Sequence, residues 1–141
     1  MHNEKLVSLK SMTFYTETVA KISRDWYPKD HIVQQVIKAK QFIDRHFADP
    51  IDLDAMALEA FYSKFHFIRC FKALYGRTPH QHLISVRMEA AKHFLETDAR
   101  IADICYRVGF ESVTSFTSLF KKMTSVTPAV YRDRKKAIFK N

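Results

Sequence analysis

Apolar residues recur at helical spacing along most of the chain, beginning after Pro28. Asp30 is predicted to cap a first helix, and the pattern breaks at residues 48–50. Asp52 can cap a second, short helix. The apolar positions that define these helices are Val33, Val36, Ile37, Phe42 and Ile43 in the first, and Leu53, Met56, Ala57 and Ala60 in the second.

A third helix is predicted between Ser63 and Gly76. Serine is a favoured N-cap residue, and Gly76 stands where a helix end requires a left-handed residue. Its inward face is expected to carry Phe67, Cys70, Phe71 and Leu74, which follow the spacing i, i+3, i+4 and i+7. The residues that remain on its outward side are Lys64, Phe65, Ile68, Arg69 and Lys72.

A longer helix is predicted to follow, from Pro79 to about residue 97. Thr78 and Pro79 combine an N-cap with the favoured first-turn proline. Its apolar positions are Leu83, Val86, Ala90, Phe94 and Leu95.

The same order of elements then begins again at Asp98. A short helix carrying Ile101, Ile104, Cys105 and Val108 is expected to stop at Gly109. The next helix is capped by Ser112, and its predicted buried residues are Phe116, Leu119, Phe120 and Met123. Thr127 and Pro128 open a last short helix, expected to extend through Tyr131.

The two serine-capped segments repeat each other at an offset of 49 residues. They read "SKFHFIRCFKALYGRTP" from Ser63 and "SVTSFTSLFKKMTSVTP" from Ser112. The positions that they share are the serine, two phenylalanines (Phe67 with Phe116, Phe71 with Phe120), a lysine (Lys72 with Lys121) and the closing Thr-Pro.

Composition supports an all-α fold. The 141 residues include only two glycines and four prolines, and no alternating apolar pattern suggests strands. We predict two homeodomain-like, three-helix subdomains of the helix-turn-helix type, joined by a long connecting helix. The predicted boundaries are an N-terminal extension at 1–29, a first subdomain at 30–78, the connecting helix at 79–97, a second subdomain at 98–135 and a basic tail at 136–141.

Positive charge is concentrated in the second part of the chain. Residues 1–62 carry 8 Lys and Arg against 9 Asp and Glu, whereas residues 63–141 carry 15 against 6. A net charge of +9 over the segment with both repeats attracts polyanions, of which nucleic acid is the commonest in the cytoplasm. The expected function is therefore DNA binding, against the alternative of an interaction module for an acidic protein partner or RNA.

A short helix, a tight turn and a serine-capped helix form a helix-turn-helix motif, whose second helix is of a size to enter the DNA major groove. The connecting helix would be roughly 27 Å long, which suits two recognition helices in successive major grooves of one DNA face. The residues predicted to contact bases are Lys64, Phe65, Ile68, Arg69, Val113, Thr114, Thr117 and Ser118. Those predicted to contact phosphates are Ser63, Lys72, Thr78, Ser112, Lys121, Lys122, Thr127 and Arg132.

Residues 31–134 also resemble the DNA-binding domain of the AraC/XylS family of bacterial transcription regulators. The matching segments are "FIDRHFADPIDLDAMA" (42–57), "SKFHFIRCFK" (63–72), "GRTPHQHL" (76–83), "RMEAA" (87–91), "IADIC" (101–105), "GFES" (109–112), "FKK" (120–122) and "TPAVYR" (127–132). The resemblance implies two helix-turn-helix subdomains on a rigid helix that bind promoter DNA. It also implies activation of transcription through contact with RNA polymerase.

The chain departs from the family pattern at two positions. Phe61 stands where the family often has glycine, and Ser125 replaces the glycine that Gly76 supplies in the first repeat. If these positions need positive φ, each non-glycine residue costs of order 1 kcal/mol. Ser118 also replaces Arg69, so base recognition is expected to be stricter in the first repeat than in the second.

Other chemistry is not favoured. His66 with Cys70, or His80 with His82, could suggest a metal site, but no second pair has ligand spacing. No nucleophile elbow, phosphate loop or paired carboxylates are found, so we predict neither an enzyme nor a cofactor. Arg87 is expected to have a structural role. The run at 132–136, "RDRKK", either contacts phosphates or forms a solvated tail.

The two cysteines are expected to be small buried residues in a reducing compartment, the cytoplasm. No apolar run approaches the ~20 residues that span a bilayer, so a membrane location is not expected. Residues 1–29 are interpreted as an arm on the first subdomain, an oligomerisation segment or the remnant of a linker. A monomer is expected for the DNA-binding domain, because two different DNA-contacting helices lie on one chain.

Overall fold

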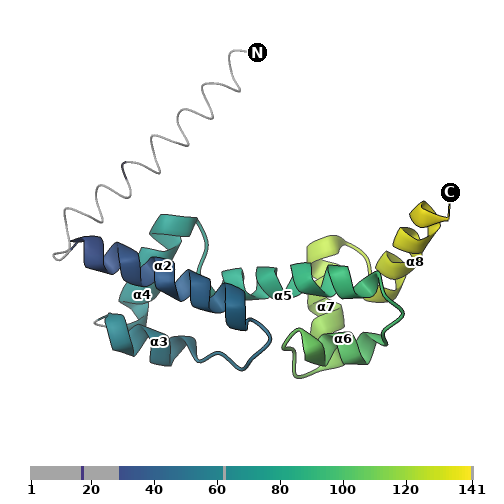
Figure 1. Ribbon diagram of the computed structural model, residues 1–141, viewed down its shortest axis with the longest axis horizontal. Coiled ribbons are helices and arrows are strands. Elements are labelled where there is room, and N and C mark those ends of the chain that lie inside the picture. The colour runs from purple at the N-terminus through teal and green to yellow at the C-terminus, as the bar shows by residue number, and fades with distance from the viewer. Residues whose placement is uncertain (1–16, 18–28, 62, 141) are drawn as a thin grey trace, which may run out of the picture. The chain divides into compact units, whose positions relative to one another are not determined.

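The computed structural model describes residues 17, 29–61 and 63–140, and these residues form helices and no strand (Figure 1). The helices are α2 (Lys29–His46), α3 (Leu53–Ala60), α4 (Lys64–Tyr75), α5 (Pro79–Leu95), α6 (Ile101–Arg107), α7 (Val113–Thr124) and α8 (Pro128–Phe139). The predicted all-α class and the two helix-turn-helix motifs, α3–α4 and α6–α7, are confirmed. Of residues 1–29, predicted to be an extension, nearly all lie outside the described part. No helix in that part is long and apolar enough to cross a membrane.

The chain divides into two compact units. Unit 1 contains described residues 29–43 and 52–82, and unit 2 contains residues 44–51 and 83–140. Helix α5 therefore contributes its first turn to unit 1 and the remainder to unit 2. The loop after α2 belongs to unit 2, although it precedes the first motif in the sequence.

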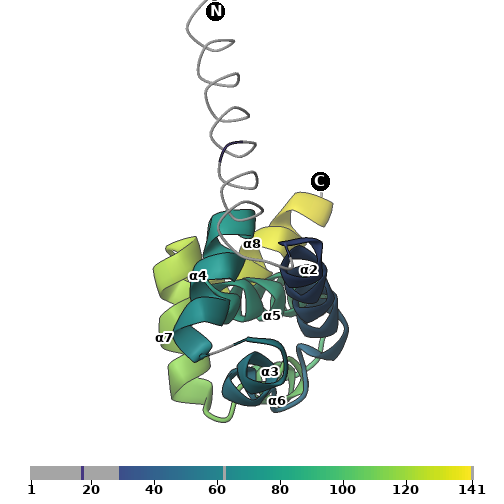
Figure 2. The same cartoon turned by 90° about the vertical axis from the view of Figure 1, so that its left-hand side faces the viewer.

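Unit 1 combines most of α2 with the α3–α4 motif, whose two helices contact each other and cross steeply (Figure 2). The buried stripe of α2 consists of Ile32, Val36, Ala39 and Ile43. Two expectations about α2 were wrong. The helix already begins at Lys29, so the predicted N-cap Asp30 lies within it. Phe42, predicted to be an inward position, is 43% exposed, because it lies beside the stripe rather than on it.

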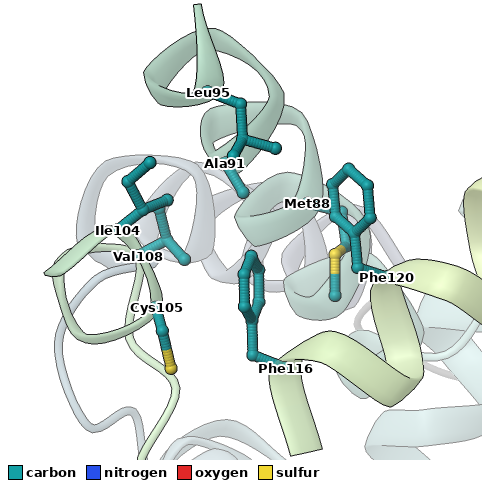
Figure 3. Packing of buried hydrophobic residues seen from close by; sticks show 8 residues of the cluster. All are labelled: Met88, Ala91, Leu95, Ile104, Cys105, Val108, Phe116 and Phe120. Atoms are coloured by element: carbon teal, nitrogen blue, oxygen red, sulfur yellow. The ribbon is translucent and has the colours of Figure 1, made fainter. Parts of the chain in front are cut away.

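Unit 2 surrounds one apolar cluster, shown in Figure 3. Residues from α5, α6, α7 and the C-cap of α6 contribute to it: Met88, Ala91, Leu95, Ile104, Cys105, Val108, Phe116 and Phe120. Burying large aromatic and aliphatic side chains of this kind stabilises a fold by about 1.5–3 kcal/mol each. The predicted inward faces of α6 and α7 are thus largely confirmed.

Two predictions for the C-terminal part of unit 2 were wrong. Met123, predicted to be buried, is 49% exposed, because the core ends one turn earlier, at Phe120. Helix α8, predicted to end near Tyr131, continues to Phe139, so most of the expected tail is helical. Lys136 Nζ lies 2.8 Å from Asp98 Oδ1, and this contact links the C-terminal part of α8 to the loop before α6.

Candidate nucleic-acid interface

The helices α4 and α7 begin and end in the same way. The Oγ atoms of Ser63 and Ser112 accept hydrogen bonds from the backbone N–H groups of His66 and Ser115, each at 3.2 Å. At the other end, Gly76 and Ser125 adopt left-handed conformations with φ of 77° and 70°. Both repeats therefore build a helix of 12 residues with the same defined ends.

The two departures from the family pattern have different consequences. Phe61 has φ of −131° and ψ of 158°, an extended conformation that any residue can adopt, so no strain arises there. Ser125 is the only described residue other than glycine with positive φ. The conformational cost expected at both positions therefore applies to Ser125 alone.

Matching aromatic contacts fix the orientation of each helix about its own axis. In unit 1 the ring centroids are 5.0 Å apart for Phe61–Phe67, 6.0 Å for Phe67–Phe71 and 5.8 Å for Phe71–His82. In unit 2 the equivalent distances are 5.3 Å for Phe110–Phe116, 5.8 Å for Phe116–Phe120 and 5.5 Å for Phe120–Tyr131. Since the phenylalanines point into the core, the residues opposite them on each helix point to solvent.

The outward side of α4 carries a large apolar ring among positive charges. Phe65 is 68% exposed, and the Nζ atom of Lys64 lies 5.7 Å from the centre of its ring. Arg69 is exposed one turn further along, and Ile68 is partly exposed between them. Burial, and to a lesser extent the charge of Arg69, lowers the pKa of His66, so this neighbour favours the neutral imidazole.

The outward side of α7 is accessible but uncharged in its first two turns. Thr114 and Ser118 are exposed, whereas Val113 and Thr117 are half-buried. The first cations, Lys121 and Lys122, are exposed in the last turn. Seven of the eight residues that were predicted to contact bases are exposed or partly exposed on the outward faces of α4 and α7. The eighth, Val113, is partly buried and packs against the apolar cluster of unit 2.

The cap hydroxyls and the lysines occupy positions suited to phosphates. Lys72 of α4 is exposed, as is its counterpart Lys121. The hydroxyl oxygens of Ser63, Thr78, Ser112 and Thr127 all accept backbone N–H groups in helix caps. A hydroxyl that accepts in this way keeps its own hydrogen as a donor for a phosphate oxygen.

Gln81 has a structural role that was not predicted. The backbone N–H of Thr78 donates to Gln81 Oε1 at 2.9 Å, while the N–H of Gln81 donates to Thr78 Oγ1 at 3.1 Å. This reciprocal pair is a capping box at the start of α5. The signal was present in the sequence, since "TPHQ" has a threonine three residues before a glutamine.

Arg132, predicted to contact a phosphate, makes two hydrogen bonds within unit 2. Its Nε atom donates to the carbonyl oxygen of Leu95 at 3.1 Å, and its Nη2 atom donates to the carbonyl oxygen of Ala99. The half-buried guanidinium thus satisfies carbonyl groups at the end of α5 and in the loop before α6.

The structural role predicted for Arg87 is confirmed. Its Nε atom donates to the carbonyl oxygen of Phe47 at 2.7 Å and its Nη2 atom to that of Asp49 at 3.1 Å. The guanidinium carbon also lies 5.9 Å from the centre of the Phe110 ring. Within unit 2, Arg87 therefore holds the loop after α2 beside the α6–α7 turn.

The cysteines are core residues. Cys70 and Cys105 are both buried free thiols, as predicted. Burial raises the pKa of Cys70 to about 12 and also raises the pKa of Cys105, so both stay protonated at neutral pH. Within 29–61 and 63–140 no group of three or more His, Cys, Asp and Glu residues has the geometry to hold a metal ion.

Comparisons with known proteins agree with this geometry. A family profile described as "Helix-turn-helix domain", of the AraC type, matches residues 56–134, which is more than half of the chain. The chain belongs to the AraC/XylS family. The family is one of DNA-binding transcription regulators and is not an enzyme family.

Two curated relatives of the AraC/XylS family illustrate the similarity. The MmsAB operon regulatory protein of Pseudomonas aeruginosa is 33% identical over 94 residues, which cover 66% of this chain and 31% of that protein. The bifunctional transcriptional activator/DNA repair enzyme AdaA of Bacillus subtilis is 36% identical over 97 residues, which cover 68% of this chain and 46% of AdaA. The chain therefore matches less than half the length of either relative.

A solved family structure shares the fold. The DNA-binding domain of the global transcriptional factor AdpA, crystallised with a target DNA, superimposes with a TM-score of 0.68 at 29% identity. The superposition covers 72% of this chain and 93% of the AdpA domain. The AraC/XylS resemblance predicted from the sequence motifs is confirmed.

Proposed function

We propose that this chain is a sequence-specific DNA-binding transcription regulator whose helices α4 and α7 enter successive major grooves of promoter DNA. The main support for this proposal is the pair of equivalent helices, which have the same caps and expose polar and basic side chains to solvent. A groove about 12 Å wide admits one such helix. The subdomains at 30–78 and 98–135 each supply one, and α5, of 17 residues, connects them in sequence.

The two helices are proposed to differ in how strictly they select bases. Arg69 in α4 can donate to both acceptors of a guanine, a contact that gives roughly 1–3 kcal/mol of discrimination. Ser118 occupies the corresponding position in α7. Thr114 and Thr117 offer methyl contacts and single hydroxyl bonds, so α7 would depend more on phosphates and on DNA shape.

Phosphate contacts are assigned to residues at both ends of the recognition helices. Lys72, Lys121 and Lys122 supply charge, and the cap hydroxyls of Ser63, Thr78, Ser112 and Thr127 supply uncharged donors. These contacts would provide most of the affinity and fix the register of the protein on DNA.

The proposed target is an asymmetric site bound by a single chain in the cytoplasm. Two non-identical recognition helices on one polypeptide need no twofold partner. By analogy with the family, binding would lead to activation through contact with RNA polymerase. Footprinting should show one monomer covering adjacent half-sites; occupancy of palindromes by two chains alone would contradict this arrangement.

Selection of bound sequences from random duplex DNA tests the proposal. An enriched motif is expected, with more information in one half-site than in the other. Arg69→Ala should relax preference at one or two base pairs of the stricter half-site. Thr117→Ala, a change on the outward side of α7, should leave the motif nearly unchanged. The alternative, a module for an acidic protein partner or RNA, predicts no enriched motif, and an unaltered motif for Arg69→Ala would refute the assignment of that residue.

A further inference from the structure

A groove lies in unit 2 beside the C-terminal end of α7. It has a volume of about 380 Å³, within the roughly 300–1,000 Å³ typical of ligand-binding pockets. Its apolar lining comes from Met123 at the end of α7, Val126 in the following turn and Ile138 of α8. Met123 and Ile138 are 49% and 68% exposed. Exposed apolar side chains gathered in one place are typical of an interaction surface.

Three cations surround this apolar lining: Lys92, Arg134 and Lys135. The Nζ atom of Lys92 lies 2.8 Å from Glu89 Oε1, and that of Lys135 lies 5.6 Å from the centre of the Tyr131 ring. None of the described lining residues is acidic. The groove therefore combines apolar walls with a positive edge.

The groove and the DNA-contacting side of α7 point in different directions. Met123 follows Phe116 by seven residues, close to two helical turns, so it lies on the same side of α7 as that buried ring. It follows Thr114 by nine residues, about two and a half turns, and so lies on the opposite side from that predicted base contact. An occupant of the groove would leave the outward side of α7 open.

We propose that this groove docks an acidic segment of a partner protein, anchored by one or two large apolar side chains. Carboxylates on both sides of such an anchor would complement Arg134 and Lys135, and the anchor would cover Met123 and Ile138. This assignment extends beyond the proposed DNA contacts and does not depend on them. A protein partner and DNA are expected to bind at the same time.

The probe is a fluorescent synthetic helical peptide with two leucines one turn apart and glutamates on either side of them. Its binding is followed by anisotropy on the whole chain, with and without saturating duplex DNA. Binding should occur in both conditions and weaken as salt increases. Versions with glutamine in place of glutamate, or alanine in place of leucine, should each bind at least about fivefold more weakly.

Substitutions in the groove separate docking from general attraction to a basic protein. Met123→Gln and Ile138→Gln should each weaken peptide binding by about fivefold or more, with DNA affinity unchanged. Val130→Gln is the matched control, since Val130 is also an exposed aliphatic residue of α8, at 41%, but does not line the groove. All three side chains are exposed, so circular dichroism should show native folding.

Three outcomes would overturn the proposal. The first is absence of peptide binding. The second is an equal effect of Val130→Gln and the two groove variants, which would indicate attraction to the whole surface. The third is displacement of the peptide by duplex DNA, which would assign Arg134 and Lys135 to phosphates instead.

Discussion

The left-handed conformation of Ser125 gives a sharp prediction for stability. Ser125 and Gly76 occupy equivalent helix ends with nearly identical backbone angles, φ 70° and ψ −1° against φ 77° and ψ 1°. In both, the N–H group donates to a carbonyl oxygen four residues earlier, at 2.8 and 2.7 Å. The two positions therefore differ in the side chain and hardly at all in backbone structure.

The expected magnitude follows from two opposing contributions. A residue with a Cβ atom loses roughly 1–2 kcal/mol in the left-handed region. Glycine gains flexibility in the unfolded chain, which cancels roughly 0.5–1 kcal/mol of that benefit. Ser125→Gly should thus stabilise unit 2 by about 0.5–1 kcal/mol. Gly76→Ser should destabilise unit 1 by a similar amount through its positive φ. No steric clash adds to this cost, because a Cβ atom at Gly76 would meet no heavy atom within 4 Å.

Residue-resolved amide hydrogen exchange can assign each effect to its own unit. Protection should increase in α6 and α7 for Ser125→Gly and decrease in α3 and α4 for Gly76→Ser. In thermal unfolding a change of 1 kcal/mol corresponds to about 4–8 °C for a unit of this size.

Ser125→Ala is the decisive control, because it removes the hydroxyl and keeps the Cβ atom. It should leave stability nearly unchanged. If Ser125→Ala stabilised unit 2 as much as Ser125→Gly, the hydroxyl and not the backbone conformation would be the source of the cost, and the reasoning would be refuted.

Three further predictions concern other parts of the chain. Gly109→Ala should destabilise unit 2 by about 2–3 kcal/mol in urea unfolding, because φ is 100° and the new Cβ atom would lie 2.8 Å from Arg87 Nε and 2.9 Å from the Phe47 carbonyl oxygen. A cost no larger than that of Gly76→Ala would contradict this prediction. Lys122→Ala should weaken binding to all duplexes alike and reduce the salt slope by about 1, and a changed base preference would argue against a phosphate contact. Cys70 should resist thiol reagents in the native state. Because folding raises its pKa from 9.0 to about 12, its contribution to stability is complete below pH 9 and is lost as the pH rises towards 12. In the Cys70→Ala variant this loss of stability between pH 9 and pH 12 should be absent.

The local features of this protein were determined by the sequence itself. Ser63 and Ser112 could be predicted as caps because an N-cap bonds to an N–H group only three residues away. The inward positions of Phe67 and Phe116 followed from the helical period, which depends on neighbours one or two turns distant. Each of these features involves interactions within a single helix and its ends.

The repeat also showed that the two halves share a plan, and the structure confirms it. The buried rings and the capped ends recur at the predicted offset. The surfaces of α4 and α7 could be assigned in advance because a side chain opposite a buried ring must face solvent.

Only the tertiary structure decided how far the core extends and which basic side chains bond to backbone groups inside the fold. The helical period indicates the side on which Met123 lies, but not that packing ends at Phe120 and leaves Met123 beside a groove. Arg132 looked like a phosphate contact because its residue type fits that role. Its actual partners are carbonyl groups 37 and 33 residues earlier, at Leu95 and Ala99, and no local pattern encodes a contact across that separation.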